Sequence, residues 1–189
     1  MSCFSGADES VVVIVGGMGP LAGVKCFEYV TRNCSTNGTD QDNLSVLAIS
    51  YPKYIVDRTE YIVGKVDQNP AESVLQFLVP QLRFLSSCYK RIVLGVPCIT
   101  FHCPPIFSVF ERSLRESFPQ VSLVSIVSET VQYIRCHHPD VVRVGIMSTN
   151  GTRQAKPFQK QMNANGITMV YLSDEQQDVV SQCIFNTEW

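Results

Sequence analysis

Cys98 is the residue of this chain best placed to do chemistry. It lies in the segment Gly95-Val96-Pro97-Cys98-Ile99-Thr100-Phe101-His102, directly after the run at residues 91–94. A buried strand there would bring the thiol to the rim of a parallel sheet, where open α/β folds bind their ligands. A neighbouring threonine hydroxyl and helix N–H groups would stabilise the thiolate. The alternative is an inert buried cysteine, which is common in protein interiors.

A glycine loop, Gly16-Gly17-Met18-Gly19, follows the β-branched run at residues 11–15. The loop lacks the G-x-G-x-x-G spacing and is followed by Pro20, so we do not expect it to bind NAD. Two interpretations stay open. The loop is either a tight turn without a ligand, or its amide groups hold a carboxylate at the start of a helix.

Two further segments offer anion-binding groups. Arg58, in an irregular stretch that we expect to be a loop, could hold a substrate carboxylate with two hydrogen bonds, although a surface salt bridge is the simpler alternative. Thr149 and Thr152 follow a predicted strand and open a predicted helix. Thr152 is either a helix N-cap or part of a pocket of hydroxyl and amide groups.

The chain offers no metal motif. The histidines at positions 102, 137 and 138 form no ligand set, and the eight cysteines contain no CxxC pair. We therefore expect neither a metal nor another cofactor. A cysteine-hydrolase pair of Cys98 and His102 is a minor alternative, because the two residues are close in sequence.

Composition limits the partners. The 189 residues are 45% hydrophobic and 17% charged, with a net charge of −2 and a pI near 5.9, so we expect a globular protein that binds neither nucleic acid nor a membrane. The first ten residues carry acids instead of the basic start of a signal peptide. We therefore expect reduced cysteines and a cytoplasmic location.

Hydrophobic patterning predicts an α/β fold. Strands are expected at residues 11–15, 44–49, 92–96, 123–127, 141–147 and 167–171, and helices at 20–30, 70–85, 106–116, 129–137, 152–165 and 174–184. Pro80 should kink or split the helix in which it lies. Alternating strands and helices indicate parallel sheets flanked by helices. We expect two similar small lobes, 1–117 carrying Cys98 and 118–189, with a ligand cleft between them.

Four blocks in this order, at residues 13–22, 51–59, 97–102 and 148–152, resemble the aspartate/glutamate racemase family, and its aspartate racemases most closely. The resemblance implies an isomerase that works without pyridoxal phosphate on a small dicarboxylic amino acid and is often a homodimer. Two cysteines then act on opposite faces of the α-carbon, one removing a proton and the other returning one. Cys98 matches the first. The substrate positions carry over to Gly17, Met18, Gly19, Arg58, Thr59, Thr100, Thr149 and Thr152.

The sequence also departs from the family pattern. Ile99 stands where the family has an asparagine, and the loss of that polar contact costs ~1–3 kcal/mol. Bulky Phe101 replaces the small residue that the family has before the histidine. The block Gly-Cys-Thr-Glu that carries the family's second cysteine does not occur up to Trp189, so the resemblance implies an incomplete second lobe with uncovered apolar surface.

We therefore expect little or no racemase activity from these 189 residues. One alternative is a pseudoenzyme that binds an acidic ligand without turnover. Another is a related isomerase or decarboxylase that uses Cys98.

Overall fold

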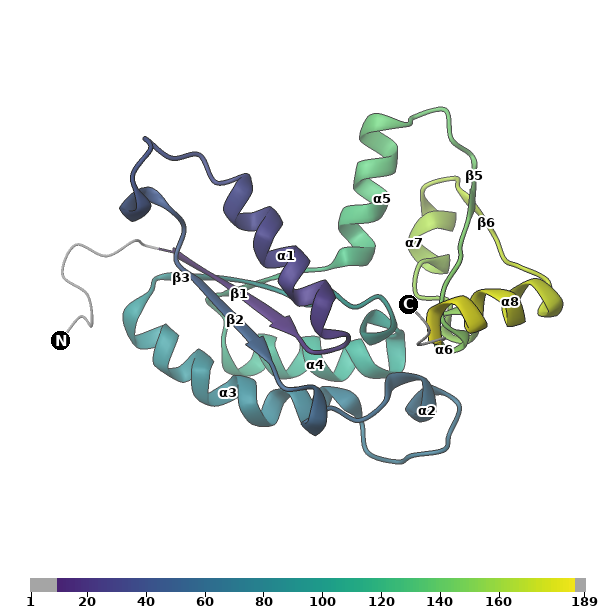
Figure 1. The fold of residues 1–189 in the computed structure, drawn as a ribbon, viewed down its shortest axis with the longest axis horizontal. Coiled ribbons are helices and arrows are strands. Elements are labelled where there is room, and N and C mark those ends of the chain that lie inside the picture. The colour runs from purple at the N-terminus through teal and green to yellow at the C-terminus, as the bar shows by residue number, and fades with distance from the viewer. Residues whose placement is uncertain (1–9, 186–189) are drawn as a thin grey trace.

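The computed structural model describes residues 10–185, and it contains two parallel sheets with helices packed around them (Figure 1). The larger sheet has the order β2-β1-β3-β4, and the smaller one pairs β5 with β6. The strands are β1 (Ser10–Gly16), β2 (Val46–Ser50), β3 (Arg91–Gly95), β4 (Val121–Val124), β5 (Arg143–Gly145) and β6 (Thr168–Val170). The expected α/β class with helix-flanked parallel sheets is confirmed. Cys3, the acidic first segment and Trp189 lie outside the described residues.

Strand β1 lies in the middle of the larger sheet. Val13 pairs with Leu47 of β2 and with Leu94 of β3. Its β-branched residues suit a strand that is covered on both faces. Alternate residues belong to the main core, where they pack with helices α3 (Pro70–Cys88) and α4 (Pro104–Ser117), which lie below the sheet in Figure 1.

Helix α1 (Pro20–Arg32) covers the other face of this sheet. The contact is close because both partners are glycines: a Cβ on Gly23 would lie 3.1 Å from Gly16 Cα. The apolar side chains of α1 are less well covered, since Leu21 is 82% and Val24 63% exposed. A patch of apolar surface therefore remains open on this helix.

Helix α3 is continuous, so the expected split at Pro80 is wrong. Asn69 caps its first turn by accepting a hydrogen bond from Ala71 N at 2.9 Å. Pro80 removes one backbone N–H, which leaves the carbonyl of Gln76 without its helical donor. Both residues are exposed, so that carbonyl is accessible to solvent and need not go unbonded.

The strand expected at residues 123–127 begins and ends earlier. Its β4 counterpart stops at Val124, because Ser125 caps helix α5 (Ile126–His137) by accepting from Ser128 N. Strand β4 pairs with β3, so the larger sheet extends past residue 117, where the first lobe was expected to end. The division into two lobes stays a prediction.

A second apolar cluster lies between α5, α7 (Gln159–Ala164) and β6, and its buried residues include Val131, Met162 and Ile167. The single helix expected at 152–165 is wrong: α6 (Asn150–Ala155) ends at Lys156, which is left-handed at φ 47°, and Pro157 follows. Proline cannot continue the helix, so a separate α7 begins. Helix α8 (Asp174–Phe185) closes the described chain.

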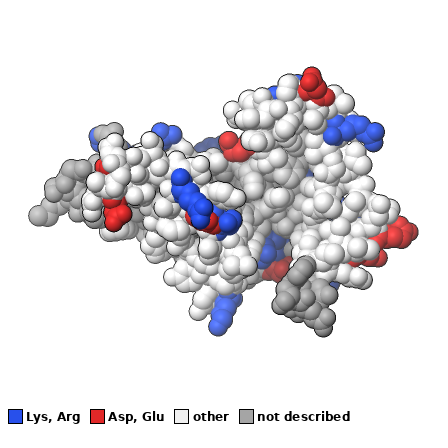
Figure 2. Space-filling view, turned by 45° about the horizontal axis from the view of Figure 1, so that its top comes forward, with Lys and Arg blue, Asp and Glu red and all other residues white. Residues whose placement is uncertain are grey.

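Short helices fill the connections. Helix α2 (Arg58–Ile62) and the 3₁₀ turns at Asp40–Asp42, Pro52–Tyr54 and Thr100–His102 lie where the sequence predicted no regular element. Figure 2 shows charged side chains as small separate groups on a mostly uncharged face. In residues 10–185 no helix is long and apolar enough to cross a membrane.

Candidate active site

The candidate site lies where β1 and β3 end. The chain passes from β1 to β2 on one side and then returns to β3 on the other, so the direction of winding changes between β1 and β3. Parallel sheets bind their ligands at such a switch point, beyond the carboxyl ends of the strands. The glycine loop after β1 and the Cys98 loop after β3 leave the sheet at this same edge.

The glycine loop is tightly packed on one side. Gly17 has φ 95°, and a Cβ on it would lie 3.2 Å from Tyr51 N, so a side chain there would collide with the loop that follows β2. Met18 is only 5% exposed and belongs to the main core. Gly19 precedes α1, and no atom lies within 4 Å of the position of its Cβ.

Cys98 is 8% exposed, with its backbone N–H donated to Val96 O at 2.8 Å. Burial raises the pKa of its thiol. The N–H of Phe101, the charge and a hydrogen bond of Arg58, and the N–H of Thr100 act in the opposite direction but do not overcome burial. Backbone N–H donors are thus present at the sulfur, whereas the Thr100 hydroxyl bonds to Thr149 and Thr152 instead, and the net shift favours the neutral thiol.

Arg58 is the first residue of α2, where a loop was expected. Asp57 caps this helix by accepting from Glu60 N at 2.8 Å, and the side chain of Arg58 interacts with Cys98. The Nε of Arg58 is buried without a hydrogen-bond partner. Among residues 10–185 Arg58 makes no ion pair, so the surface salt bridge considered as the simpler role is wrong.

Three threonine hydroxyls connect the turn after β3 with the start of α6. Thr100 Oγ1 lies 2.8 Å from Thr152 Oγ1 and 3.2 Å from Thr149 Oγ1. Thr149, and not Thr152, is the N-cap of α6, because its hydroxyl accepts from Thr152 N. Thr152 is 1% exposed and faces inward from the same helix. Its interpretation as an N-cap is therefore wrong.

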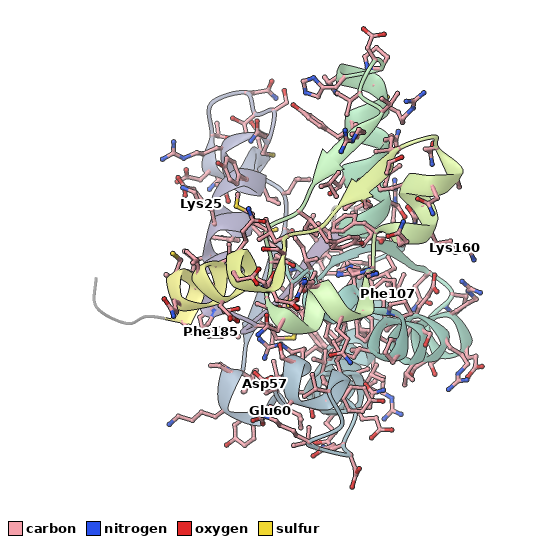
Figure 3. All side chains as sticks on the ribbon, turned by 90° about the vertical axis from the view of Figure 1, so that its right-hand side faces the viewer. Lys25, Asp57, Glu60, Phe107, Lys160 and Phe185 are labelled. Carbon is pink, nitrogen blue, oxygen red and sulfur yellow. The ribbon has the colours of Figure 1, made fainter. Side chains whose placement is uncertain are left out.

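Thr59 reaches the same region through a close helix contact. A Cβ on Gly151 of α6 would lie 2.8 Å from Thr59 Oγ1 and 3.0 Å from Thr59 Cα. Helices α2 and α6 can approach this closely only because residue 151 is a glycine. Figure 3 shows this side of the molecule, with Asp57 and Glu60 marking α2.

His102 supports the Cys98 loop from behind. Its Nδ1 lies 2.9 Å from Cys98 O, and its ring stacks on Phe107 with centroids 4.3 Å apart. Burial lowers the pKa of His102, and its Nε2 is buried without a partner. Neither ring nitrogen is bonded to the thiol, so the geometry does not favour a cysteine-hydrolase pair.

Three other cysteines, Cys103, Cys136 and Cys183, differ in their burial. Cys103 is fully buried; burial first, and then the charge of Cys98, raise its pKa to about 12. Cys136 and Cys183 are exposed. Within residues 10–185 no group of three or more His, Cys, Asp or Glu side chains could hold a metal ion.

Comparison with known proteins bears on the fold. No family model matches the sequence. The structure superimposes on Picrophilus torridus aspartate racemase with a TM-score of 0.69 and 23% identity, over 93% of this chain and 66% of that one. This chain has the aspartate racemase fold. An aspartate racemase homologue from Pyrococcus horikoshii OT3 gives a TM-score of 0.63 and 19% identity, over 93% of this chain and 70% of that one.

Within the racemase fold, the structure brings together most residues singled out from the sequence. Arg58 lies beside Cys98, and Thr100, Thr149 and Thr152 form one hydroxyl cluster. Met18 differs, since its side chain packs in the core. Cys98 does not line any of the four surface pockets described in this structure.

Two residues that shape the candidate site were not predicted from the sequence. Gly151 sets the approach of α6 to α2, and Gln177, which is 3% exposed, donates to Ser148 O at 2.9 Å. A glycine between two threonines at a helix start is a usable signal for a close approach. A glutamine on a polar helix gives no such signal.

Proposed function

We propose that this chain is a member of the aspartate/glutamate racemase family that binds a small dicarboxylic amino acid without a cofactor. The observation that carries the proposal is the contact of Arg58 with Cys98 at the switch point of the sheet. A guanidinium holds a carboxylate, and an adjacent thiolate can remove the α-proton of the same ligand.

The polar groups fit an acidic amino acid. The unpartnered Nε of Arg58 is a donor awaiting an acceptor. The hydroxyls of Thr100, Thr149 and Thr152 bond to one another and can turn to a carboxylate when a ligand enters. The fold likeness to an aspartate racemase supports the same substrate class.

The proposed proton transfer takes place on one face of the α-carbon only. Cys98 as a thiolate takes the proton from the α-carbon, leaving a carbanion stabilised by the carboxylate, and returns a proton to the same face. Inversion needs a second acid on the opposite face. In the described part of the chain the thiol near Cys98 is Cys103, which is buried behind the same loop with a pKa of about 12. We therefore propose that these 189 residues exchange the α-proton with little inversion.

The competing function is a binding protein without turnover. It is favoured by the raised pKa of Cys98, which keeps most of the sulfur as neutral thiol near neutral pH. It is also favoured by Ile99, which is 36% exposed beside Cys98 and offers an apolar side chain to a ligand.

Incubation of the polypeptide with L-aspartate in D₂O separates these outcomes. Loss of the α-proton signal without D-aspartate, abolished by Cys98→Ser but not by Cys183→Ser, supports one-sided exchange. Formation of D-aspartate contradicts the one-sided mechanism. Saturable binding that requires Arg58 but gives no exchange favours the binding protein, and absence of binding excludes the proposed ligand class.

We also propose a cytoplasmic homodimer. Six described cysteines are free thiols, which supports a reducing compartment: Cys26, Cys34, Cys98, Cys103, Cys136 and Cys183. The exposed Leu21 and Val24 of α1 support self-association. Light scattering at several protein concentrations tests the dimer. A monomer mass at every concentration contradicts it.

A further inference from the structure

A polar pocket lies beside α6. It has a volume of about 370 Å³ and is lined by Asn150, Arg153, Gln154, Lys156 and Tyr171. Its size lies in the range of small-molecule sites. It is formed by helix α6 and strand-end residue Tyr171, and none of the residues proposed to hold the amino acid lines it.

The lining carries two cations and no acid. Arg153 Nη2 donates to Leu172 O at 3.0 Å and to Asp174 Oδ1 at 2.7 Å, and the Asp174 side chain is 88% exposed. Lys156 Nζ lies 5.0 Å from the centroid of the Tyr171 ring and has no carboxylate within salt-bridge distance among residues 10–185. The charge of Lys156 is therefore not neutralised, whereas that of Arg153 is partly neutralised by Asp174, and the pocket is positively charged on balance.

The uncharged side chains also present donors. Asn150 Oδ1 accepts from Ser181 Oγ at 3.1 Å, which leaves its NH₂ group as the available part of the amide. Gln154 is exposed, and its amide can turn its NH₂ inward. A site of cations and N–H donors selects an anion with several acceptor oxygens.

Lys156 occupies a backbone position that lysine rarely takes. Its φ of 47° is left-handed, in the C-cap of α6, where glycine or asparagine is favoured. The cation is thus held at the pocket at a conformational cost to the fold.

We propose that this pocket binds the phosphate group of a small phosphorylated metabolite. A phosphate offers several oxygens to Arg153, Lys156 and the two amides at once, and the volume leaves space for a small polar group esterified to it. A dicarboxylate divides its charge between two ends and is held less well by donors that line one pocket.

The test is calorimetric titration with inorganic phosphate, glycerol 3-phosphate and malonate. Lys156→Asn is the informative variant, because asparagine suits the left-handed C-cap and only the cation is lost. Lys160→Asn is the matched control, since Lys160 is an exposed lysine of α7 outside the pocket, labelled in Figure 3. We expect saturable binding of glycerol 3-phosphate that Lys156→Asn weakens about tenfold and Lys160→Asn leaves unchanged.

Equal affinities of Lys156→Asn and the original protein for glycerol 3-phosphate would contradict the proposed site. Malonate binding as tight as glycerol 3-phosphate binding, and equally dependent on Lys156, would overturn the phosphate class. Aspartate binding should be unaffected by Lys156→Asn, so failure of this proposal and failure of the proposed function are separate results.

Discussion

The hydroxyls of Thr100 and Thr152 lie 2.8 Å apart, although the two residues are 52 positions apart in the chain. Thr100 belongs to the loop after β3 and Thr152 to helix α6, so this bond connects the larger sheet with the helix that follows β5. Both residues are buried, at 9% and 1% exposed. The contact therefore fixes how the candidate site is assembled.

Thr152→Val should lower the free energy of unfolding by about 1–3 kcal/mol, because the hydroxyls of Thr100 and Thr149 lose a buried partner. Valine keeps the volume of threonine, so packing changes little. Urea denaturation provides the measurement. Thr168→Val, on an exposed strand position, is the matched control and should change stability by less than about 0.5 kcal/mol. Equal effects of both variants would contradict the role of the hydroxyl bond.

Gly151→Ala should push α6 away from α2, since the new Cβ would lie 2.8 Å from Thr59 Oγ1 and 3.0 Å from Thr59 Cα. Overpacking of this kind costs about 1–3 kcal/mol. Thermal unfolding measures the loss. Gly145→Ala is the control, because no atom lies within 4 Å of the position of its Cβ. A Gly151→Ala protein as stable as Gly145→Ala would show that the helices do not need this close approach.

Arg58→Gln should slow alkylation of Cys98 by iodoacetamide. The charge and hydrogen bond of Arg58 lower the Cys98 pKa against the larger effect of burial, so their removal raises that pKa further and reduces the thiolate fraction. Peptide mass spectrometry resolves the rate at each cysteine, and exposed Cys183 serves as the internal control. Faster alkylation of Cys98 with an unchanged rate at Cys183 would show that Arg58 shields the thiol more than it activates it.

Stability should fall in alkaline solution partly because of Cys103. Burial raises the pKa of this thiol from 9.0 to about 12, so between these values the unfolded chain releases a proton that the folded chain keeps. The unfolded state then binds fewer protons, and the free energy of unfolding decreases with pH by about 1.4 kcal/mol per unit.

Urea denaturation at about pH 8 and about pH 10.5 tests this linkage. Cys103→Ala should lose less stability between the two pH values than the original protein, whereas Cys183→Ala should lose as much. An identical loss in all three proteins would show that Cys103 does not contribute.

Local sequence patterns were enough to predict the class of fold and the main chemical groups. The β-branched run of β1, the apolar run before Cys98 and the alternation of strands and helices are local patterns, so parallel strands and the position of the thiol at a strand end could be predicted. The end of α6 is also encoded locally, because Pro157 cannot continue a helix.

Which groups meet depends on long-range packing. The pairing of β4 with β3, the contact of Arg58 with Cys98 and the hydroxyl bond from Thr100 to Thr152 join segments far apart in the chain, and no local pattern encodes their distance. The pKa of Cys98 is likewise a property of burial, because desolvation outweighs the donors around the sulfur. Local preferences set the elements, whereas long-range packing set the environment that decides what Cys98 can do.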